Sequence, residues 1–251
     1  MSEWLVLALA MLAACAVVLS ITVLRQRRIS DDDDPSETPD VIEYMTMMVG
    51  VVYAIVLGLA IAGVWEARNA AQDTVRAEAQ ALHEVTERVQ AYAPAARDRT
   101  REDVNAYVTH VVKKEWPVML DRGELTDKGT QLLAKVRADL TSYEPRNDHE
   151  GQSYQPLLDQ VGAADAARNA RAQAAEPTMP GVVWFGLIAG ALVAVGLIFT
   201  LQIRRSPREL MLAGLYSALI AFLLFLIWDF NSPFGHDVAD ATGIFSDLFA
   251  V

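Results

Sequence analysis

Apolar and polar residues follow one another in long blocks along the chain, and four of the apolar blocks are each about 20 residues long. A helix of that length crosses the roughly 30 Å hydrocarbon core of a bilayer. The blocks contain no Asp, Glu, Lys, Arg or His, so they lack the groups typical of proton relays and ion-coupled transporters. The four predicted spans are Trp4 to Leu24, Tyr44 to Trp65, Gly181 to Ile203 and Leu210 to Trp228.

The region between the second and third spans, residues 66–180, predicts a helical extramembrane domain. It is rich in Ala, Gln, Glu and Arg and has no alternating strand pattern. Pro117 and the turn at Asp121 to Gly123 are expected to separate its helices, and Glu144 to Gly151 reads as a polar turn. The predicted helices run from about Asp98 to Glu115, Thr126 to Thr141 and Tyr154 to Ala175.

The second span is predicted to continue into this domain as one helix. No Pro or Gly interrupts the chain between Val64 and Ala93, and Pro94 ends it. A helix from Tyr44 to Ala93 would be about 75 Å long. Its second half carries a seam with a 3.5-residue period, which suits packing within one subunit or between subunits. The seam consists of Ala71, Val75, Glu78, Leu82, Val85, Val89 and Tyr92.

The predicted fold is therefore an all-α integral membrane protein of three parts. Residues 1–65 form an N-terminal membrane pair, residues 66–180 the inserted helical domain, and residues 181–251 a C-terminal membrane pair. The tail is hydrophobic, so it is expected to lie along the membrane surface as an interfacial helix or to insert into a neighbour. These tail residues are Ile244, Phe245, Leu248, Phe249 and Val251.

Basic residues predict the orientation of the spans, because translocation of positively charged short loops is disfavoured. The loops with Arg25 to Arg28 and Arg204 to Arg208 are expected in the cytoplasm. Both termini and the 66–180 domain are then expected outside it. Tryptophans at the outer ends of the spans fit the same orientation. They are Trp4, Trp65, Trp184 and Trp228.

Composition excludes several other classes of protein. Hydrophobic residues make up 53% of the 251 residues, and 32 acidic residues against 21 basic ones give a formal charge of -11, which argues against a nucleic-acid partner. The one cysteine, Cys15, excludes an intramolecular disulfide. Leu12 to Cys15 resembles a lipoprotein processing box, but the basic residues follow the apolar run, so we interpret it as part of a span.

No candidate for an enzyme, a metal site or a cofactor emerges from the sequence. The four histidines are dispersed, and Asp31 to Asp34 lacks the spacing of a calcium loop, which favours a solvated linker. Glu84 and Glu87 are typical of a helix surface, and no phosphate-binding or nucleophile motif is present. We therefore expect no catalytic residue, no metal and no cofactor.

Small residues recur at four-residue intervals in three of the spans. In lipid such stripes allow backbones to approach closely, so close helix packing is the first interpretation, and the alternative is that one stripe lines a pore. Beyond the second span, Glu66 and Asp73 would then form an acidic pore mouth that favours cations. The second-span stripe, the candidate for pore or packing, is Gly50, Ala54, Gly58 and Ala62; the packing stripes are Gly186, Gly190 and Ala194 in the third span and Ala213, Ser217 and Ala221 in the fourth.

Several short motifs resemble the bacterial bestrophin-like membrane proteins, a family catalogued as a domain of unknown function. They are Trp65-Glu66-Ala67-Arg68, Ala77-Glu78-Ala79-Gln80-Ala81-Leu82, Glu115-Trp116-Pro117, Arg168-Asn169-Ala170-Arg171 leading to Pro180 and Trp184, and Asp229-Phe230-Asn231-Ser232-Pro233-Phe234. The resemblance implies a multi-pass protein of the bacterial plasma membrane. Bestrophins are pentameric anion channels whose second helix lines the pore, and in them the large middle region is cytoplasmic, opposite to the side that the basic residues predict here.

Two functions follow from these observations. The first is a homo-oligomeric ion channel or pore, a pentamer by analogy with bestrophins, with the second span near its axis and membrane lipids and ions as its partners. The second is a non-conducting membrane scaffold or envelope sensor that uses the helical domain. The scaffold predicts that the stripe from Gly50 to Ala62 is buried between helices of one subunit, whereas a pore leaves it open toward the axis.

Overall fold

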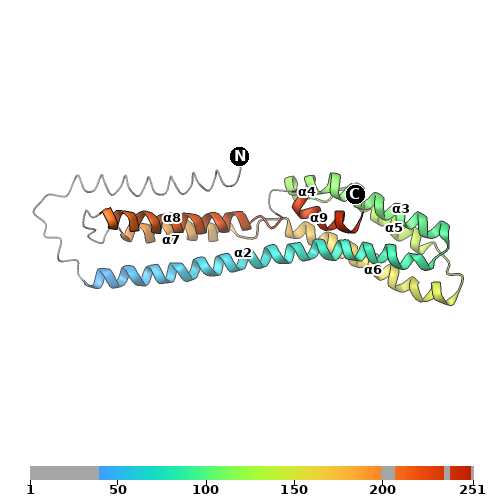
Figure 1. Cartoon of the computed structure of the whole chain (residues 1–251), viewed down its shortest axis with the longest axis horizontal. Helices are drawn as coiled ribbons and strands as arrows, with labels where there is room; N and C mark the ends of the chain where they lie inside the picture. Colours follow the sequence, from blue (N-terminus) through green and yellow to red (C-terminus); the bar gives the residue numbers. More distant parts are fainter. Residues whose placement is uncertain (1–39, 199–206, 235–237, 250–251) are drawn as a thin grey trace, which may run out of the picture. The chain divides into compact units, whose positions relative to one another are not determined.

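The computed structural model describes residues 40–198, 207–234 and 238–249, and within these residues it contains helices but no strand (Figure 1). The chain divides into two compact units. The apolar unit comprises residues 1–65 and Met179–Asn231, and the polar unit comprises Glu66–Thr178 and Ser232–Val251. The first predicted span, Cys15, Arg25 to Arg28, Asp31 to Asp34 and residues 199–206 lie outside the described residues.

Helix α2, Asp40–Arg88, is one helix of 49 residues that contributes to both units. It continues into the short 3₁₀ helix η1, Val89–Ala91, and the next helix begins at Pro94. A proline in the first turn of a helix is tolerated because the N–H it lacks would have no helical partner there. The predicted continuation of the second span beyond Trp65 is thus present as an unbroken helix.

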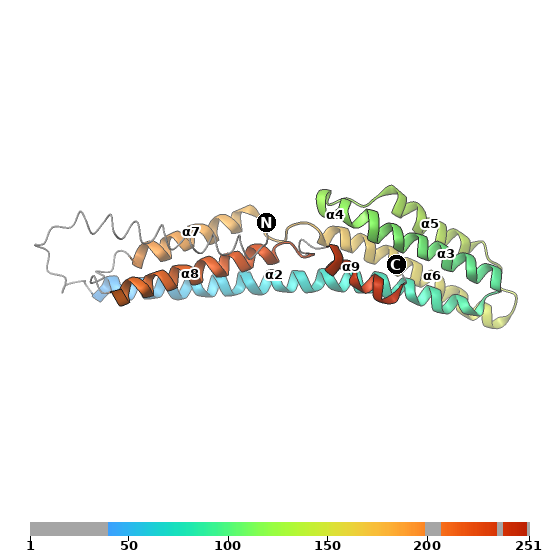
Figure 2. The ribbon, with the colours of Figure 1, turned by 45° about the horizontal axis from the view of Figure 1, so that its top comes forward.

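In the apolar unit, α7 (Gly181–Ile198) and α8 (Pro207–Phe230) pack with the first part of α2 (Figures 1 and 2). Their shared core includes Tyr53, Leu57 and Val64 of α2, with Leu187 of α7 and Ile227 of α8. Large apolar side chains cover the outside of the same helices, which is unfavourable in water and favourable in lipid. Examples are Val51, Ile55 and Leu59 of α2, Phe185 and Leu192 of α7, and Leu215 and Leu219 of α8.

Two helices are long and apolar enough to cross a membrane, with apolar stretches in Tyr44–Ala91 and Met211–Phe230. The apolar stretch Gly181–Leu197 is shorter. These long apolar helices and their apolar outer surface are typical of a membrane protein. The four-span arrangement itself is not established by the described residues, because the first predicted span is not among them.

The polar unit is a helical bundle around the second part of α2. Its helices are α3 (Pro94–His110), the π-helical turn η2 (Val111–Glu115), α4 (Trp116–Arg122), α5 (Asp127–Thr141), α6 (Asp148–Ala174) and α9 (Val238–Leu248). Every residue of the predicted 3.5-residue seam on α2 is buried here. The apolar seam residues belong to the core of the bundle, so the seam packs within one chain.

Two predicted helix boundaries in this unit were wrong. Pro117 does not end a helix, because η2 adds one wider turn before it and Pro117 occupies the first turn of α4. Gly123, with a φ of 69°, ends that helix as expected. Helix α6 begins at Asp148, within the predicted polar turn, because the Asn147 side chain accepts a hydrogen bond from the Glu150 N–H and caps it.

The C-terminal tail also differs from both expectations for it. Helix α9 packs into the core of the polar unit, where Phe245 and Phe249 are buried. The ring of Phe249 meets His83 of α2 edge to face, with ring centroids 6.3 Å apart. The apolar face of α9 is thus covered by its own chain rather than by a membrane surface or a neighbouring subunit, while Val251 lies outside the described residues.

Candidate functional site

The small-residue stripe of α2 lies beside the face that packs in the apolar unit. Ala54, Gly58 and Ala62 are exposed, and Gly50 is half-buried. A Cβ added at Gly58 would meet no atom within 4 Å, whereas one at Gly50 would lie 3.9 Å from the Tyr216 hydroxyl. Ala54, Gly58 and Ala62 are therefore not the surface through which α2 contacts α7 and α8, whereas Gly50 lies beside Tyr216 of α8.

The two residues of the predicted pore mouth, Glu66 and Asp73, are exposed on α2. Glu66 follows Ala62 by four residues and Asp73 follows Glu66 by seven, so both stay on the side of the helix that the stripe occupies. The Asp73 carboxylate forms an exposed ion pair with the Arg76 guanidinium at 2.8 Å. The positive charge of Arg76 thus compensates the negative charge of Asp73, and Glu66 is the stronger candidate for a fixed negative charge at the pore mouth.

The predicted packing stripe of α7 lies partly against α2 and partly on the exposed surface. Gly190 is where α2 approaches most closely, since a Cβ there would lie 2.6 Å from Cε2 of Tyr53. The Tyr53 hydroxyl donates a hydrogen bond of 2.9 Å to the Leu187 carbonyl, which fixes the ring against the α7 backbone. Ala194 is buried in the same core, but Gly186 is exposed.

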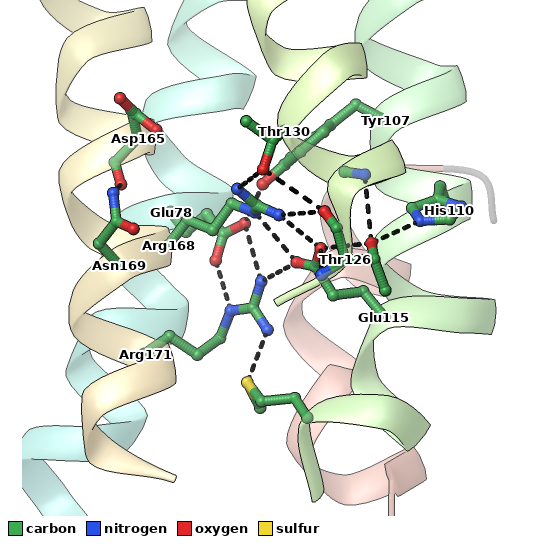
Figure 3. A network of polar contacts seen from close by, with 12 residues as sticks. Glu78, Tyr107, His110, Glu115, Thr126, Thr130, Asp165, Arg168, Asn169 and Arg171 are labelled. Carbon is green, nitrogen blue, oxygen red and sulfur yellow. Dashed lines mark hydrogen bonds and ion pairs between the residues drawn. The ribbon is translucent and has the colours of Figure 1, made fainter. Parts of the chain in front are cut away.

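Four charged residues that the sequence did not single out as a site meet in the core of the polar unit (Figure 3). They are Glu78 of α2, Glu115 of η2, and Arg168 and Arg171 of α6, each at most 2% exposed. Arg171 joins the two carboxylates, with Nε 2.7 Å from Glu78 and Nη2 2.9 Å from Glu115. Arg168 holds Glu115 through Nη2 at 2.6 Å and Nε at 3.0 Å. The four side chains are thus linked in the order Glu78, Arg171, Glu115 and Arg168, and their two negative and two positive charges balance.

Local helix geometry brings these side chains together. Arg168 and Arg171 are three residues apart and continue the buried face of α6 that includes Val161 and Ala164. The π-helical turn ends at Glu115, and such turns often place a side chain that an α-helix would misdirect. Apart from Glu150 near the start of α6, the other buried residues of α6 are apolar, as is Val111, the other buried residue of η2.

The Glu115 carboxylate also caps the beginning of α5. Its Oε2 accepts hydrogen bonds from the Thr126 N–H at 3.1 Å and from the Thr126 hydroxyl at 2.8 Å. Gly129, in the first turn of α5, lies so close that an added Cβ would overlap Glu115 Oε2 and approach Arg168 Nη2 to 2.7 Å. A glycine is needed here for this close approach, while the helix N-terminus favours the negative charge.

Other groups complete the network at its edges. The Tyr107 hydroxyl donates to Glu78 Oε1 at 2.6 Å, and the Arg171 guanidinium lies over the Trp116 ring at 4.9 Å. His110 Nε2 lies 2.8 Å from the Thr126 hydroxyl. Because that hydroxyl gives its proton to Glu115, Nε2 of His110 must be the donor to Thr126 Oγ1.

The surroundings fix the protonation of the buried groups. Burial alone would raise the pKa of Glu115, but hydrogen bonds and charge from Arg168, with the charge of Arg171, lower it to about 2. Burial likewise lowers the pKa of Arg171, yet the Glu78 carboxylate outweighs this and raises the pKa above its ordinary value. Burial, followed by the charge of Glu78, raises the pKa of Tyr107, so its hydroxyl remains a donor.

This arrangement can fix the relative positions of α2, η2, α5 and α6. A buried charge that has lost its partner is strongly unfavourable, so displacement of any one of these elements from the others would cost free energy. In the described residues, no group of three or more His, Cys, Asp or Glu side chains could hold a metal ion. We refer to Glu78, Glu115, Arg168 and Arg171 as the ion-pair network.

A signal for the network was present in the sequence. Glu78 was the polar interruption of the apolar seam, and Glu115, Arg168 and Arg171 lay within short motifs of the family resemblance. Three motifs far apart in the chain thus converge on one buried cluster. Charge pairing between them could not be deduced from spacing alone, since the partners are separated by as many as 93 residues.

Comparison with known proteins agrees with that resemblance. A bestrophin-like domain family matches residues 12–239, which is most of the chain. No curated protein and no solved structure matches the chain. The matched range includes the apolar helices and the whole ion-pair network, and the chain belongs to the bestrophin-like family of membrane proteins.

Proposed function

We propose that this bestrophin-like protein is a homo-oligomeric ion channel in which the small-residue face of α2 lies at the central axis. The proposal includes four membrane spans per subunit, with both termini and the polar unit outside the cytoplasm. A ring of about five subunits is the assembly that the bestrophin analogy favours. Membrane lipids, ions and further copies of the same chain are then its partners.

The exposure of Ala54, Gly58 and Ala62 is the observation that carries this proposal. A stripe of small residues that served packing within the chain would lie against another helix, as half-buried Gly190 does against Tyr53 and as buried Ala194 does in the shared core. On α2 the packing is done by Tyr53, Leu57 and Val64 instead. The stripe is therefore free to face a second copy of α2 or a water-filled axis. A scaffold with this stripe buried in one subunit is disfavoured.

The exposed side of α2 changes character along its length, as a pore helix requires. Near the stripe it carries apolar residues such as Val51 and Ile55, which would form a dry constriction. Beyond the stripe, Glu66 and the Asp73–Arg76 pair are exposed and would line a hydrated mouth. Glu66 supplies the uncompensated charge, which favours cations by raising their local concentration.

Planar-bilayer recording of the purified protein tests the proposal. We expect a single-channel current that Gly58→Trp abolishes, because the indole would fill the axis. The matched control is Gly196→Trp on α7, where an added Cβ likewise meets no atom within 4 Å, and there the current should persist. No current across pH, voltage and tension, or equal currents in both variants, would contradict a pore along α2.

Assembly and selectivity are tested separately. The mass of the protein in detergent should correspond to a ring of several subunits, and a monomer would exclude a central pore. In a salt gradient, the reversal potential should indicate cations in the wild type and shift toward zero in Glu66→Gln. An anion preference unaffected by Glu66→Gln would instead follow the bestrophin analogy and remove Glu66 from the mouth.

A further inference from the structure

Two buried carboxylate oxygens on neighbouring helices of the polar unit have no hydrogen-bond donor. Asp103 of α3 is 4% exposed, and its Oδ1 accepts a hydrogen bond of 2.5 Å from Lys135 of α5. Its Oδ2 has no partner, and neither has Oδ2 of Asp139, one turn after Lys135 on α5. A buried polar atom without a partner costs free energy, so the pair requires an explanation.

A single proton removes both deficits. Asp139 follows Lys135 by one turn on the same side of α5, so the hydrogen bond from Lys135 places the Asp103 carboxylate beside the Asp139 side chain. Two ionised carboxylates are acceptors alone and would repel each other. When Asp139 is protonated, its O–H can donate to Asp103 Oδ2, while Lys135 still neutralises Asp103 from the other side. We propose that Asp103 and Asp139 share one proton and form a latch between α3 and α5 that acid strengthens.

The charges around the pair are consistent with this role. The hydrogen bond that protonated Asp139 would donate to Asp103 raises the pKa of Asp139 most, followed by burial and by the charge of Asp103, while Arg99 and Lys135 oppose the shift. On α3, Glu102 is a second acid near Lys135. Helix α6, which also packs on α5, presents Asp165 to Arg137 at 3.5 Å. The cations near the pair are therefore Lys135, already bound to Asp103, and Arg99.

The sign of the effect follows from the direction of the shift. The pKa of Asp139 is higher in the folded chain than in the unfolded chain. The stabilisation from the shared proton is therefore complete at acidic pH and is lost as the pH rises through the folded-state pKa. At neutral pH, two like charges then remain between α3 and α5.

Thermal unfolding of the full chain in detergent, from pH 4 to pH 8 in ~1-unit steps, tests the latch. Asp139→Asn supplies an amide N–H at the same place without titration, so it should raise the melting temperature at pH 8 and lose this advantage toward pH 4. Asp159→Asn on α6 removes an exposed carboxylate and is the control; its difference from wild type should not follow this course.

Infrared difference spectra between pH 4 and pH 8 provide a second readout that does not depend on stability. The wild type should show the carbonyl stretch of a buried protonated carboxyl, and Asp139→Asn should lose it. If the Asp139→Asn spectrum equals that of the wild type, or if Asp139→Asn destabilises at pH 8, the shared proton does not exist. Neither measurement depends on ion conduction, so its outcome leaves the channel proposal untouched.

Discussion

Replacement of Arg171 by methionine should break the ion-pair network at its centre. Methionine keeps much of the volume and the flexible stem, but it removes the bonds to Glu78 and Glu115. Glu115 retains Arg168 and Thr126, whereas Glu78 retains one donor, the Tyr107 hydroxyl. The variant therefore leaves one largely uncompensated carboxylate in the core.

The expected cost is large because the site is fully buried. Removal of one partner from a buried ion pair typically costs about 3–5 kcal/mol. Glu78 and Arg171 are both 0% exposed, so solvent cannot relieve the loss. For a unit of this size the melting temperature should fall by roughly 10–20 °C. Arg137→Met, which breaks an exposed ion pair with Asp165 between α5 and α6, should cost at most about 1 kcal/mol.

Hydrogen exchange of the α5 and α6 amides in the detergent-solubilised chain measures this cost as an opening free energy. In the double variant Glu78→Gln with Arg171→Met, the stranded charge is gone and the amide oxygen still accepts from Tyr107. The double variant should therefore be more stable than Arg171→Met alone. A cost for Arg171→Met no greater than that of Arg137→Met, or costs that simply add in the double variant, would refute the reasoning.

Three further outcomes are expected. Gly129→Ala should destabilise by about 1–3 kcal/mol through overpacking, while Gly162→Ala, where a Cβ meets no atom, should stabilise slightly in the same unfolding assay. The stability that Glu115 contributes should be complete above pH 4.5 and be lost as the pH falls through about 2, measured by acid titration of unfolding against Glu115→Gln. Gly190→Ala should lower the melting temperature more than Gly186→Ala, because a Cβ at Gly190 alone overlaps another helix.

Much of the helical pattern was predictable because it depends on local physics. The unbroken helix beyond Trp65 follows from the absence of Pro and Gly, and the start of α5 follows from Thr126, whose hydroxyl accepts from the Gly129 N–H. The error at Pro117 arose because a proline can occupy a first helical turn as well as end a helix. The π-helical turn η2 before Pro117 could not be predicted, because the spacing of apolar residues does not reveal such a turn.

The pairing of charged residues that are far apart in the chain could not be predicted from the sequence. Glu78 has its basic partner on a helix 93 residues away, and no periodicity on α2 reveals which charge will meet it. The tail was interpreted as a membrane-surface segment because its apolar face suits lipid as well as a protein core. The exposure of Ala54 and Gly58 beside a packed face likewise depends on which side of α2 the other helices occupy.

Thiol modification of single-cysteine variants tests most directly whether α2 lines a pore. Cys15 is the one native cysteine, so its replacement by alanine gives a clean background. We predict that a charged thiol reagent blocks the current of Ala54→Cys, Gly58→Cys and Ala62→Cys, and that it leaves Leu192→Cys on the outside of α7 unaffected. Currents from all four variants that the reagent leaves unchanged would contradict the placement of α2 at the axis.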